Sequence, residues 1–279
     1  MSVARDIKDL KIQGASEIAK AGIKDLNSYG NNLKSKTRKN FTEELEIHAG
    51  KLKTARPTEP ALRNCLDRII YEIRKSKNEG ILRLKKELFI YCKEEVLRIK
   101  TNMKKIEEYG VSVIPENSIV LTHCHSHNVV NILRKADPVK VFATETRPRF
   151  QGRLTAKEIA SSGIETELIV DDAVADVMKQ VDLVIMGADA ITRDGIVNKV
   201  GSLMIAEIAH NYKKPLYIGA STLKIIEKIE IEERDSDEVW KGAPKDIKIE
   251  NYAFDVVPYK YVAKIVTERG VIDPKKLRF

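Results

Sequence analysis

The chain has 279 residues, of which 43% are hydrophobic and 32% are charged, enough for one large domain or two smaller ones. No window approaches the roughly 18 consecutive apolar residues of a membrane span, and three cysteines without paired spacing exclude a disulfide framework. Residues 1–10 are charged and do not resemble a secretory signal, so a cytoplasmic protein without a membrane partner is expected.

The first part of the chain is expected to be helical. Apolar residues recur at helical spacing over residues 18–26, 62–73 and 81–106. This pattern predicts an N-terminal helical domain over residues 1–108. Two of the three cysteines, Cys65 and Cys92, lie on these helical patterns and are expected in the core.

The net charge of +8 arises in this same region. Residues 1–108 contain 25 Lys and Arg against 16 Asp and Glu. Such an excess can attract RNA or an anionic small molecule. The more ordinary interpretation, which we favour, is that lysine-rich helix faces are exposed to solvent. Specific RNA binding is therefore not expected.

From Gly110 the pattern changes to short β-branched runs that alternate with helical stretches. The runs cover residues 118–122, 139–143, 166–170, 182–187, 215–219 and 262–266. This alternation is typical of βαβ units around a parallel sheet and predicts an α/β domain over residues 109–279. The sequence contains neither the glycine-rich dinucleotide fingerprint nor a Walker motif, so a fold for those nucleotides is unsupported.

Cys124 occupies a position that favours chemistry. It follows the apolar run 119–122, and Ser126 is a suitable N-cap for a helix over residues 127–135. Ligands bind at the carboxyl ends of strands in open α/β sheets, and a helix N-terminus favours the reactive thiolate. The alternative is a buried, inert cysteine.

Three further polar stretches follow predicted strands. Residues 144–153 carry three arginines that suit phosphate or carboxylate recognition, Asp189 follows the run 182–187, and Lys199 lies in a helix start that suits an anion. Each has an ordinary alternative, namely a solvated loop, a helix-capping aspartate or a routine helix start. Together they predict one crevice lined by a thiol, a carboxyl group and several cations.

A metal site is not predicted, although His123 and His125 lie on either side of Cys124. Alternate residues of a strand point to opposite faces, so both imidazoles are expected to face away from the thiol. No second Cys/His pair with zinc spacing occurs in the sequence.

Taken as a set, the motifs resemble a known superfamily. They lie at residues 122–126, 144–152, 187–191, 198–201, 231–235, 253–256 and 265–270, with looser matches at 12–15 and 55–57. The chain is similar to the sugar-phosphate isomerases related to regulatory subunits of the exchange factor for translation initiation factor two. Within that superfamily it looks most like the archaeal ribose-1,5-bisphosphate isomerases.

The resemblance implies a helical domain joined to a Rossmann-like parallel-sheet domain, in a homodimer or homohexamer. It places the catalytic cysteine at Cys124 and the catalytic aspartate at Asp189. It also implies a set of residues that contact a small phosphorylated sugar: Gly14, Ala15, Arg56, Ser126, His127, Asn128, Arg147, Gln151, Asn198, Lys199 and Lys224. No metal or redox cofactor is implied, because the oxidation state only moves within the sugar.

The expected reaction is conversion of ribose 1,5-bisphosphate to ribulose 1,5-bisphosphate in nucleotide (AMP) degradation. Cys124, with a lowered pKa, would remove the C2 proton, and protonated Asp189 would donate to a sugar oxygen. Two alternatives stay open: a methylthioribose-1-phosphate isomerase and a non-catalytic regulatory subunit of a translation-initiation complex. Gln13 departs from the arginine of the bisphosphate isomerases, and the chain ends at Phe279 without the longer tail of some relatives.

Overall fold

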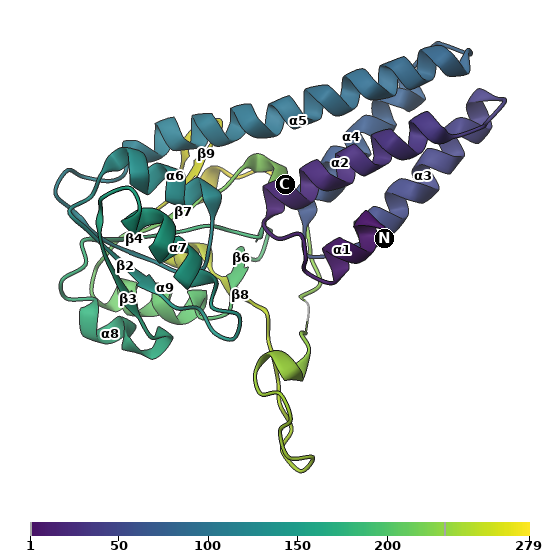
Figure 1. Ribbon diagram of the computed structural model, residues 1–279. Coiled ribbons are helices and arrows are strands. Elements are labelled where there is room, and N and C mark those ends of the chain that lie inside the picture. The colour runs from purple at the N-terminus through teal and green to yellow at the C-terminus, as the bar shows by residue number, and fades with distance from the viewer. Residues whose placement is uncertain (1, 232) are drawn as a thin grey trace. The chain divides into compact units, whose positions relative to one another are not determined.

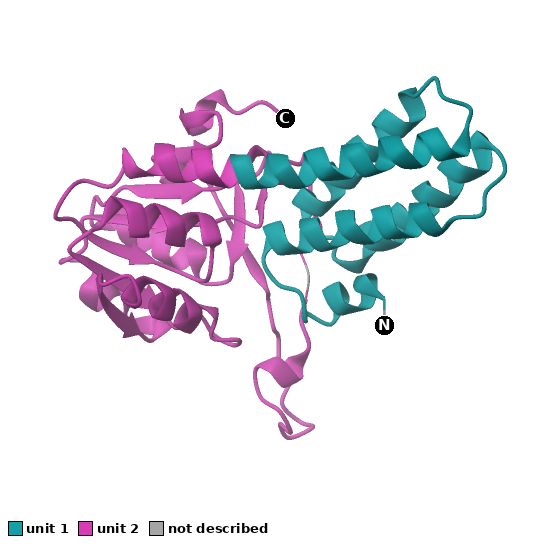
Figure 2. Ribbon diagram, turned by 45° about the horizontal axis from the view of Figure 1, so that its top comes forward, with its two compact units in different colours: residues 1–101 teal, residues 102–279 magenta. Residues whose placement is uncertain are grey.

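The computed structural model describes residues 2–231 and 233–279 and divides the chain into two compact units, residues 1–101 and 102–279 (Figure 2). The division falls inside one long helix, α5 (Ile81–Val111). The predicted boundary after residue 108 lies in the same helix. The predicted fold class is confirmed, because the chain has a helical N-terminal region followed by a mainly parallel sheet covered by helices.

Unit 1 consists of helices (Figure 1). They are α1 (Val3–Lys8), α2 (Ala15–Asn32), α3 (Arg38–Ala55), α4 (Pro60–Lys75) and the first part of α5. The large side chains fully buried here are apolar, for example Phe41, Leu45 and Ile69. Gly30 allows close packing, since a Cβ added there would lie 2.3 Å from Leu88 Cδ2 and 2.9 Å from Leu45 Cδ2. Burial of these apolar faces therefore stabilises unit 1.

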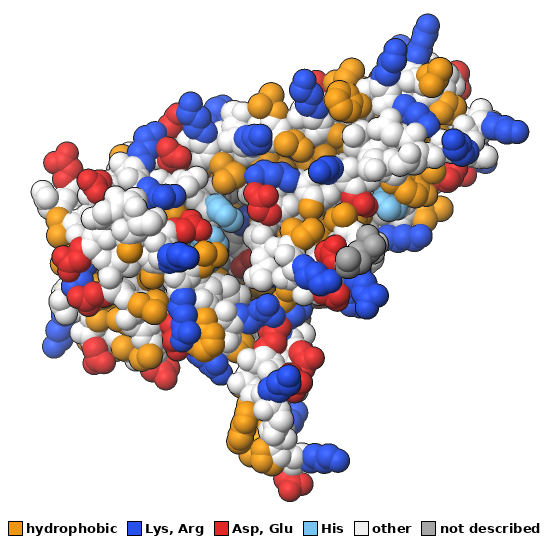
Figure 3. Space-filling view, viewed as in Figure 1, with side chains coloured by type: hydrophobic (Ala, Val, Ile, Leu, Met, Phe, Trp, Pro, Cys, Tyr) orange, Lys and Arg blue, Asp and Glu red, His pale blue; other side chains and the backbone are white. Residues whose placement is uncertain are grey.

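The basic excess of unit 1 lies on its surface. Figure 3 shows Lys and Arg side chains spread along the visible helices of this unit, with apolar side chains between them. The exposed apolar residues include Leu82, Phe89, Ile90 and Leu97 of α5. On the face shown, this spread agrees with solvated helix faces rather than one concentrated basic patch. No helix in the described part of the chain is both long and apolar enough to span a bilayer.

Unit 2 is built on a seven-stranded sheet with the order β10-β9-β7-β4-β1-β2-β3. Its strands are β1 (Ile119–Thr122), β2 (Lys140–Thr144), β3 (Glu165–Ile169), β4 (Leu183–Met186), β7 (Leu216–Gly219), β9 (Lys264–Thr267) and β10 (Gly270–Ile272). Only β10 pairs antiparallel in this sheet. Each of the six predicted runs overlaps a strand. Val120 of β1 pairs with Val141 of β2 and with Leu183 of β4, which places β1 at the centre.

Helices cover both faces of this sheet (Figure 1). Val120 and Ile185 pack with residues of α6 (His127–Ala136), α7 (Gln151–Ala160) and the end of α5. Leu121 and Val184 pack on the opposite side with residues of α8 (Val174–Val177) and α9 (Ser202–Asn211). Successive residues of β1 and β4 therefore enter different cores, as expected for strands that are buried on both faces.

A second, three-stranded antiparallel sheet was not predicted. It has the order β5-β6-β8 and contains β5 (Ala190–Ile191), β6 (Ile196–Lys199) and β8 (Phe254–Val257). Residues 233–252, which precede β8, project from the rest of unit 2 as an arm (Figure 2). Short 3-10 helices complete the unit: η1 (Asp171–Ala173), η2 (Thr222–Lys224), η3 (Ser236–Glu238), η4 (Tyr259–Tyr261) and η5 (Pro274–Lys276).

Candidate functional site

The two predicted catalytic residues follow the two strands that flank the topological switch point of the sheet. The chain leaves β1 toward β2 on one side, whereas β4 pairs with β1 on the other side. Ligands of open α/β sheets bind outside the carboxyl ends of strands at such a reversal. Cys124 comes two residues after β1 ends, and Asp189 comes three residues after β4 ends. The fold therefore brings both residues to the same edge of the sheet.

The backbone at Cys124 has an unusual conformation that its neighbours hold. Its φ is 65°, in the left-handed region that residues with a Cβ seldom adopt. Its N–H donates to Thr146 Oγ1 over 2.9 Å, and its carbonyl accepts from Thr155 Oγ1 over 2.8 Å. Ser126 is the N-cap of α6, as predicted, although its side chain makes no capping hydrogen bond.

The pKa of the half-buried Cys124 thiol is raised to about 12. Burial is the largest cause, and the negative charge of Asp189 adds to it. The His125 backbone N–H and the Lys199 ammonium act in the opposite direction but are weaker. The predicted lowering of this pKa is therefore wrong, because desolvation and a nearby carboxylate outweigh the start of α6.

Lys199 is buried in the same electrostatic environment. It ends β6, only 6% of it is exposed, and its Nζ lies 6.0 Å from the centroid of the Phe254 ring. Burial lowers its pKa, and the charges of Cys124 and Asp189 oppose that shift. The thiol, the carboxylate and the ammonium predicted for one crevice therefore act on one another electrostatically.

The start of α9 differs from its prediction as an anion site. The carboxylate of Asp255, on β8, accepts hydrogen bonds from the N–H groups of Gly201 (2.8 Å) and Leu203 (3.0 Å). The helix start is thus capped by the chain itself. Asn198 donates to Ser202 Oγ over 2.8 Å. Asp255 was missed because it lies 54 residues beyond Gly201, although it belongs to the motif 253–256.

The arginines of the β2–α7 loop also have partners within unit 2. Arg147 donates to the Val239 carbonyl over 3.0 Å, and Arg149 pairs with Glu238 over 2.9 Å. Arg234 also pairs with Glu238, over 2.9 Å. The β2–α7 loop is therefore attached to the first residues of the arm. Within the motif 231–235, Glu232 lies outside the described residues.

Further contacts hold the start of this loop and leave two predicted residues with unused oxygens. The Asp171 carboxylate accepts from the backbone N–H groups of Thr146 (2.8 Å) and Arg147 (2.6 Å). Gln151, the first residue of α7, and Asn128, in the first turn of α6, each have a buried side-chain oxygen without a hydrogen-bond partner. Such oxygens can accept hydrogen bonds from the hydroxyl groups of a sugar.

Two glycines allow close packing at the carboxyl edge of the sheet. A Cβ added to Gly152 would lie 1.6 Å from the Thr144 carbonyl oxygen, so α7 can begin beside β2 only with glycine there. A Cβ added to Gly187 would lie 2.7 Å from Ser126 Oγ. Lys224 follows β7 and hydrogen-bonds to the Ala188 carbonyl, next to Asp189.

The histidines on either side of Cys124 make contacts within the protein. Both ring nitrogens of His123 have protein partners, Thr144 Oγ1 at 2.6 Å and the Val200 carbonyl at 2.9 Å. His125 packs edge-to-face on His127, with ring centroids 4.8 Å apart, and its Nδ1 lies 3.0 Å from Thr155 Oγ1. Within residues 2–231 and 233–279, no three His, Cys, Asp or Glu side chains form a group that could hold a metal ion.

The remaining predicted residues, Gly14, Ala15 and Arg56, belong to unit 1. Gly14 precedes α2 with a φ of 83°, and Ala15 begins that helix. Arg56 follows α3 and pairs with Glu59 over 3.6 Å, while its buried Nε has no hydrogen-bond partner. The part that these three residues take in substrate binding stays a prediction.

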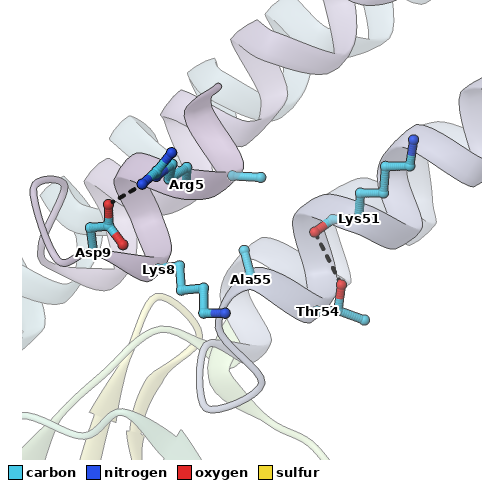
Figure 4. A pocket seen from close by; sticks show the side chains of 7 residues that line it. Arg5, Lys8, Asp9, Lys51, Thr54 and Ala55 are labelled. Carbon is cyan, nitrogen blue, oxygen red and sulfur yellow. Dashed lines mark hydrogen bonds and ion pairs between the residues drawn. The ribbon is translucent and has the colours of Figure 1, made fainter. Parts of the chain in front are cut away.

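Unit 1 also has a surface pocket of about 520 Å³ between α1 and α3 (Figure 4). Its charged lining consists of Arg5, Lys8, Asp9 and Lys51. Arg5 and Asp9 form an ion pair at 3.5 Å. None of the predicted site residues lines this pocket.

A family model described as the initiation factor 2 subunit family matches residues 11–274. The chain belongs to this family. One curated member of similar sequence is the ribose 1,5-bisphosphate isomerase of Pyrococcus furiosus, which is 36% identical over 98% of this chain and 90% of the relative.

Two solved structures from Pyrococcus horikoshii share this family fold. The translation initiation factor eIF-2B has a TM-score of 0.83 and 27% identity, covering 98% of this chain and 96% of the other. The 5-methylthioribose 1-phosphate isomerase has a TM-score of 0.82 and 31% identity, covering 98% and 83% respectively. The predicted family resemblance is thereby confirmed.

Proposed function

We propose that this chain is an aldose–ketose isomerase that converts ribose 1,5-bisphosphate to ribulose 1,5-bisphosphate. The observation that carries the proposal is the placement of Cys124 and Asp189 after β1 and β4, at the switch point of the sheet. Similarity along nearly the whole chain to a ribose 1,5-bisphosphate isomerase supports it. Such a pair can act as base and acid on neighbouring atoms of one sugar.

The proposed reaction is balanced within the sugar. Asp189 gives a proton to the ring oxygen while the bond between that oxygen and C1 breaks. The Cys124 thiolate removes the proton from C2. The resulting enol then loses its C2 hydroxyl proton to Asp189 and receives a proton from Cys124 at C1. C2 is thus oxidised, C1 is reduced, and both side chains return to their starting protonation states.

The raised pKa of Cys124 indicates how this pair would be charged. At a pKa of about 12, the thiolate is rare at neutral pH. The Asp189 carboxylate raises that pKa, so transfer of the thiol proton to Asp189 would create base and acid together. The net charge of the pair does not change in this transfer. Lys199, which favours the thiolate, supports the charged sulfur.

The choice of substrate rests on cations and buried acceptors. Lys199 and Arg56 would bind phosphate groups, and the unpartnered oxygens of Asn128 and Gln151 would accept from sugar hydroxyls. An apolar methylthio group placed against Arg56 would leave that charge desolvated. We therefore favour the bisphosphate over methylthioribose 1-phosphate.

The test is a phosphorus NMR assay of the purified protein with each of the two sugar phosphates. Ribose 1,5-bisphosphate should be converted much more efficiently. Arg56→Ala should raise the KM for it by about tenfold to hundredfold, the scale of lost hydrogen bonds to a charged group, with a smaller change in kcat. Better turnover of methylthioribose 1-phosphate would overturn the substrate assignment, and no turnover of either would favour a regulatory subunit.

The proposed assembly is a homodimer or homohexamer, in line with the family resemblance. Light scattering at micromolar concentration would measure its mass. A monomer would contradict this part of the proposal without affecting the chemistry.

A further inference from the structure

Three buried polar side chains that the proposed chemistry does not use lie between the ends of β1 and β2. They are His123, Thr144 and Thr146, and none of them is more than 2% exposed. Thr144 Oγ1 lies 2.6 Å from His123 Nδ1 and 3.2 Å from Thr146 Oγ1. Thr146 Oγ1 in turn accepts the backbone N–H of Cys124 over 2.9 Å. The three side chains form one continuous hydrogen-bonded chain that ends on the cysteine.

The direction of each hydrogen bond follows from its end points. The Val200 carbonyl can only accept, so His123 Nε2 carries a hydrogen toward it. Burial lowers the pKa of His123, which keeps the ring neutral and makes Nδ1 an acceptor. Thr144 then donates to Nδ1 and is left to accept from Thr146. Thr146 can therefore receive the Cys124 N–H while donating its own hydroxyl hydrogen.

This chain of hydrogen bonds connects three loops at the carboxyl edge of the sheet. His123 belongs to the β1–α6 loop, Thr146 to the β2–α7 loop, and Val200 follows Lys199 in the β6–α9 loop. Both ends of the Cys124–Thr146 hydrogen bond have left-handed backbone, with φ of 65° and 63°. This conformation is unfavourable for residues with a Cβ, so it persists only where surrounding contacts fix it.

We propose that His123, Thr144 and Thr146 form a positioning network for Cys124. The network holds the left-handed backbone of Cys124 and so fixes the place of the thiol. Through Val200 it also fixes the loop that follows Lys199. The role of this network in isomerisation rests on the function proposed above. None of the three residues is proposed to contact the sugar.

The primary test compares Thr146→Val with Thr146→Ser. Valine keeps the β-branched shape but removes the acceptor for the Cys124 N–H, whereas serine keeps the hydroxyl. We expect kcat for ribose 1,5-bisphosphate to fall roughly tenfold to hundredfold in Thr146→Val, the scale of a small misplacement of a catalytic group, with KM nearly unchanged. Thr146→Ser should restore most of kcat.

The matched control is Thr166→Val on β3. Thr166 also loses one hydroxyl, which donates to the Ile164 carbonyl over 2.9 Å, but it lies outside the network. Its kcat should equal that of the wild type. If Thr146→Val does not fold, Thr144→Val removes the next link of the network, and its kcat should fall by less than in the primary variant.

A second measurement separates this inference from the proposed function. The alkylation rate of Cys124 by iodoacetamide, followed peptide by peptide with mass spectrometry, does not require a substrate. We expect it to change several-fold in Thr146→Val and to stay constant in Thr166→Val. An unchanged kcat together with an unchanged alkylation rate in folded Thr146→Val would overturn the network. Absence of isomerase activity in the wild type would overturn the function, while the alkylation arm would still decide the positioning.

Discussion

The interior of unit 1 and the carboxyl edge of the sheet in unit 2 are both buried, but with different chemistry. In unit 1, Phe41, Leu45 and Ile69 are fully buried by contacts that need no particular orientation. At the sheet edge, His123 and Thr146 are equally buried, and each relies on directed hydrogen bonds. Apolar burial is non-directional, whereas a buried polar group is costly unless it meets its partner. The first kind of interior stabilises a fold without fixing orientations, and the second kind fixes the orientation of individual groups.

The largest expected effect at the polar edge comes from Cys124→Ser. Serine is far too weak an acid to replace the thiol as a base, and loss of a general base typically lowers the rate by about 10²–10⁴-fold. The melting temperature should stay close to that of the wild type, because the backbone contacts of residue 124 are retained. Undiminished kcat in this variant would refute the assigned base.

In the apolar interior the corresponding change is Leu45→Ala. Leu45 is fully buried and packs beside Gly30. Such truncations destabilise by about 2–5 kcal/mol, because transfer energy is lost and a cavity remains. Urea denaturation should show this loss, while kcat per folded molecule stays unchanged. A matched loss of kcat in the folded variant would mean that the two interiors are not separable in this way.

A smaller effect is expected where a glycine has free space. Gly50 lies inside α3, and a Cβ added there meets nothing within 4 Å. Gly50→Ala should stabilise the protein by about 0.5–1 kcal/mol, since alanine loses less backbone entropy in a helix. The matched control is Gly30→Ala, where the new Cβ would clash with Leu88, and thermal unfolding should show the opposite sign.

The smallest expected effect is on the pH dependence. If the Cys124 proton moves to Asp189, the reactive and resting states bind the same number of protons. The value of kcat/KM should then change by less than about twofold between pH 7 and pH 9, although the thiol pKa is about 12. Loss of that proton to solvent would instead raise kcat/KM tenfold for each pH unit below the pKa. A profile of the free enzyme distinguishes the two slopes.

The features that the sequence predicts correctly are local ones. The β-branched runs around Val120 and Val184 match strands, and Ser126 begins a helix, because each depends on residues within a few positions. The strand ends then place Cys124 and Asp189 at one edge of the sheet. This placement follows from the rule that ligands bind at the carboxyl ends of strands in an open α/β sheet. It therefore requires no knowledge of contacts between distant residues.

The features that the sequence does not predict depend on distant partners. Asp255 caps α9 from another strand, and Thr146 accepts the N–H of a cysteine 22 residues earlier. The pKa of Cys124 was predicted with the wrong sign for the same reason. A helix start is visible in the local sequence, whereas the burial of the thiol and its proximity to the Asp189 carboxylate arise only on folding. Strand β5 likewise has only two residues, too few for a period to be recognised.

The contact between Gly152 and the Thr144 carbonyl has a consequence for how this loop can evolve. At most loop positions, substitution by a larger side chain is tolerated because the backbone can shift. Here the obstacle is backbone in the neighbouring strand, 1.6 Å from any Cβ, so every replacement must displace β2 itself. Substitutions of the arginines around it would leave this backbone contact unchanged. Residue 152 is therefore expected to stay glycine in any variant that keeps the start of α7 beside β2.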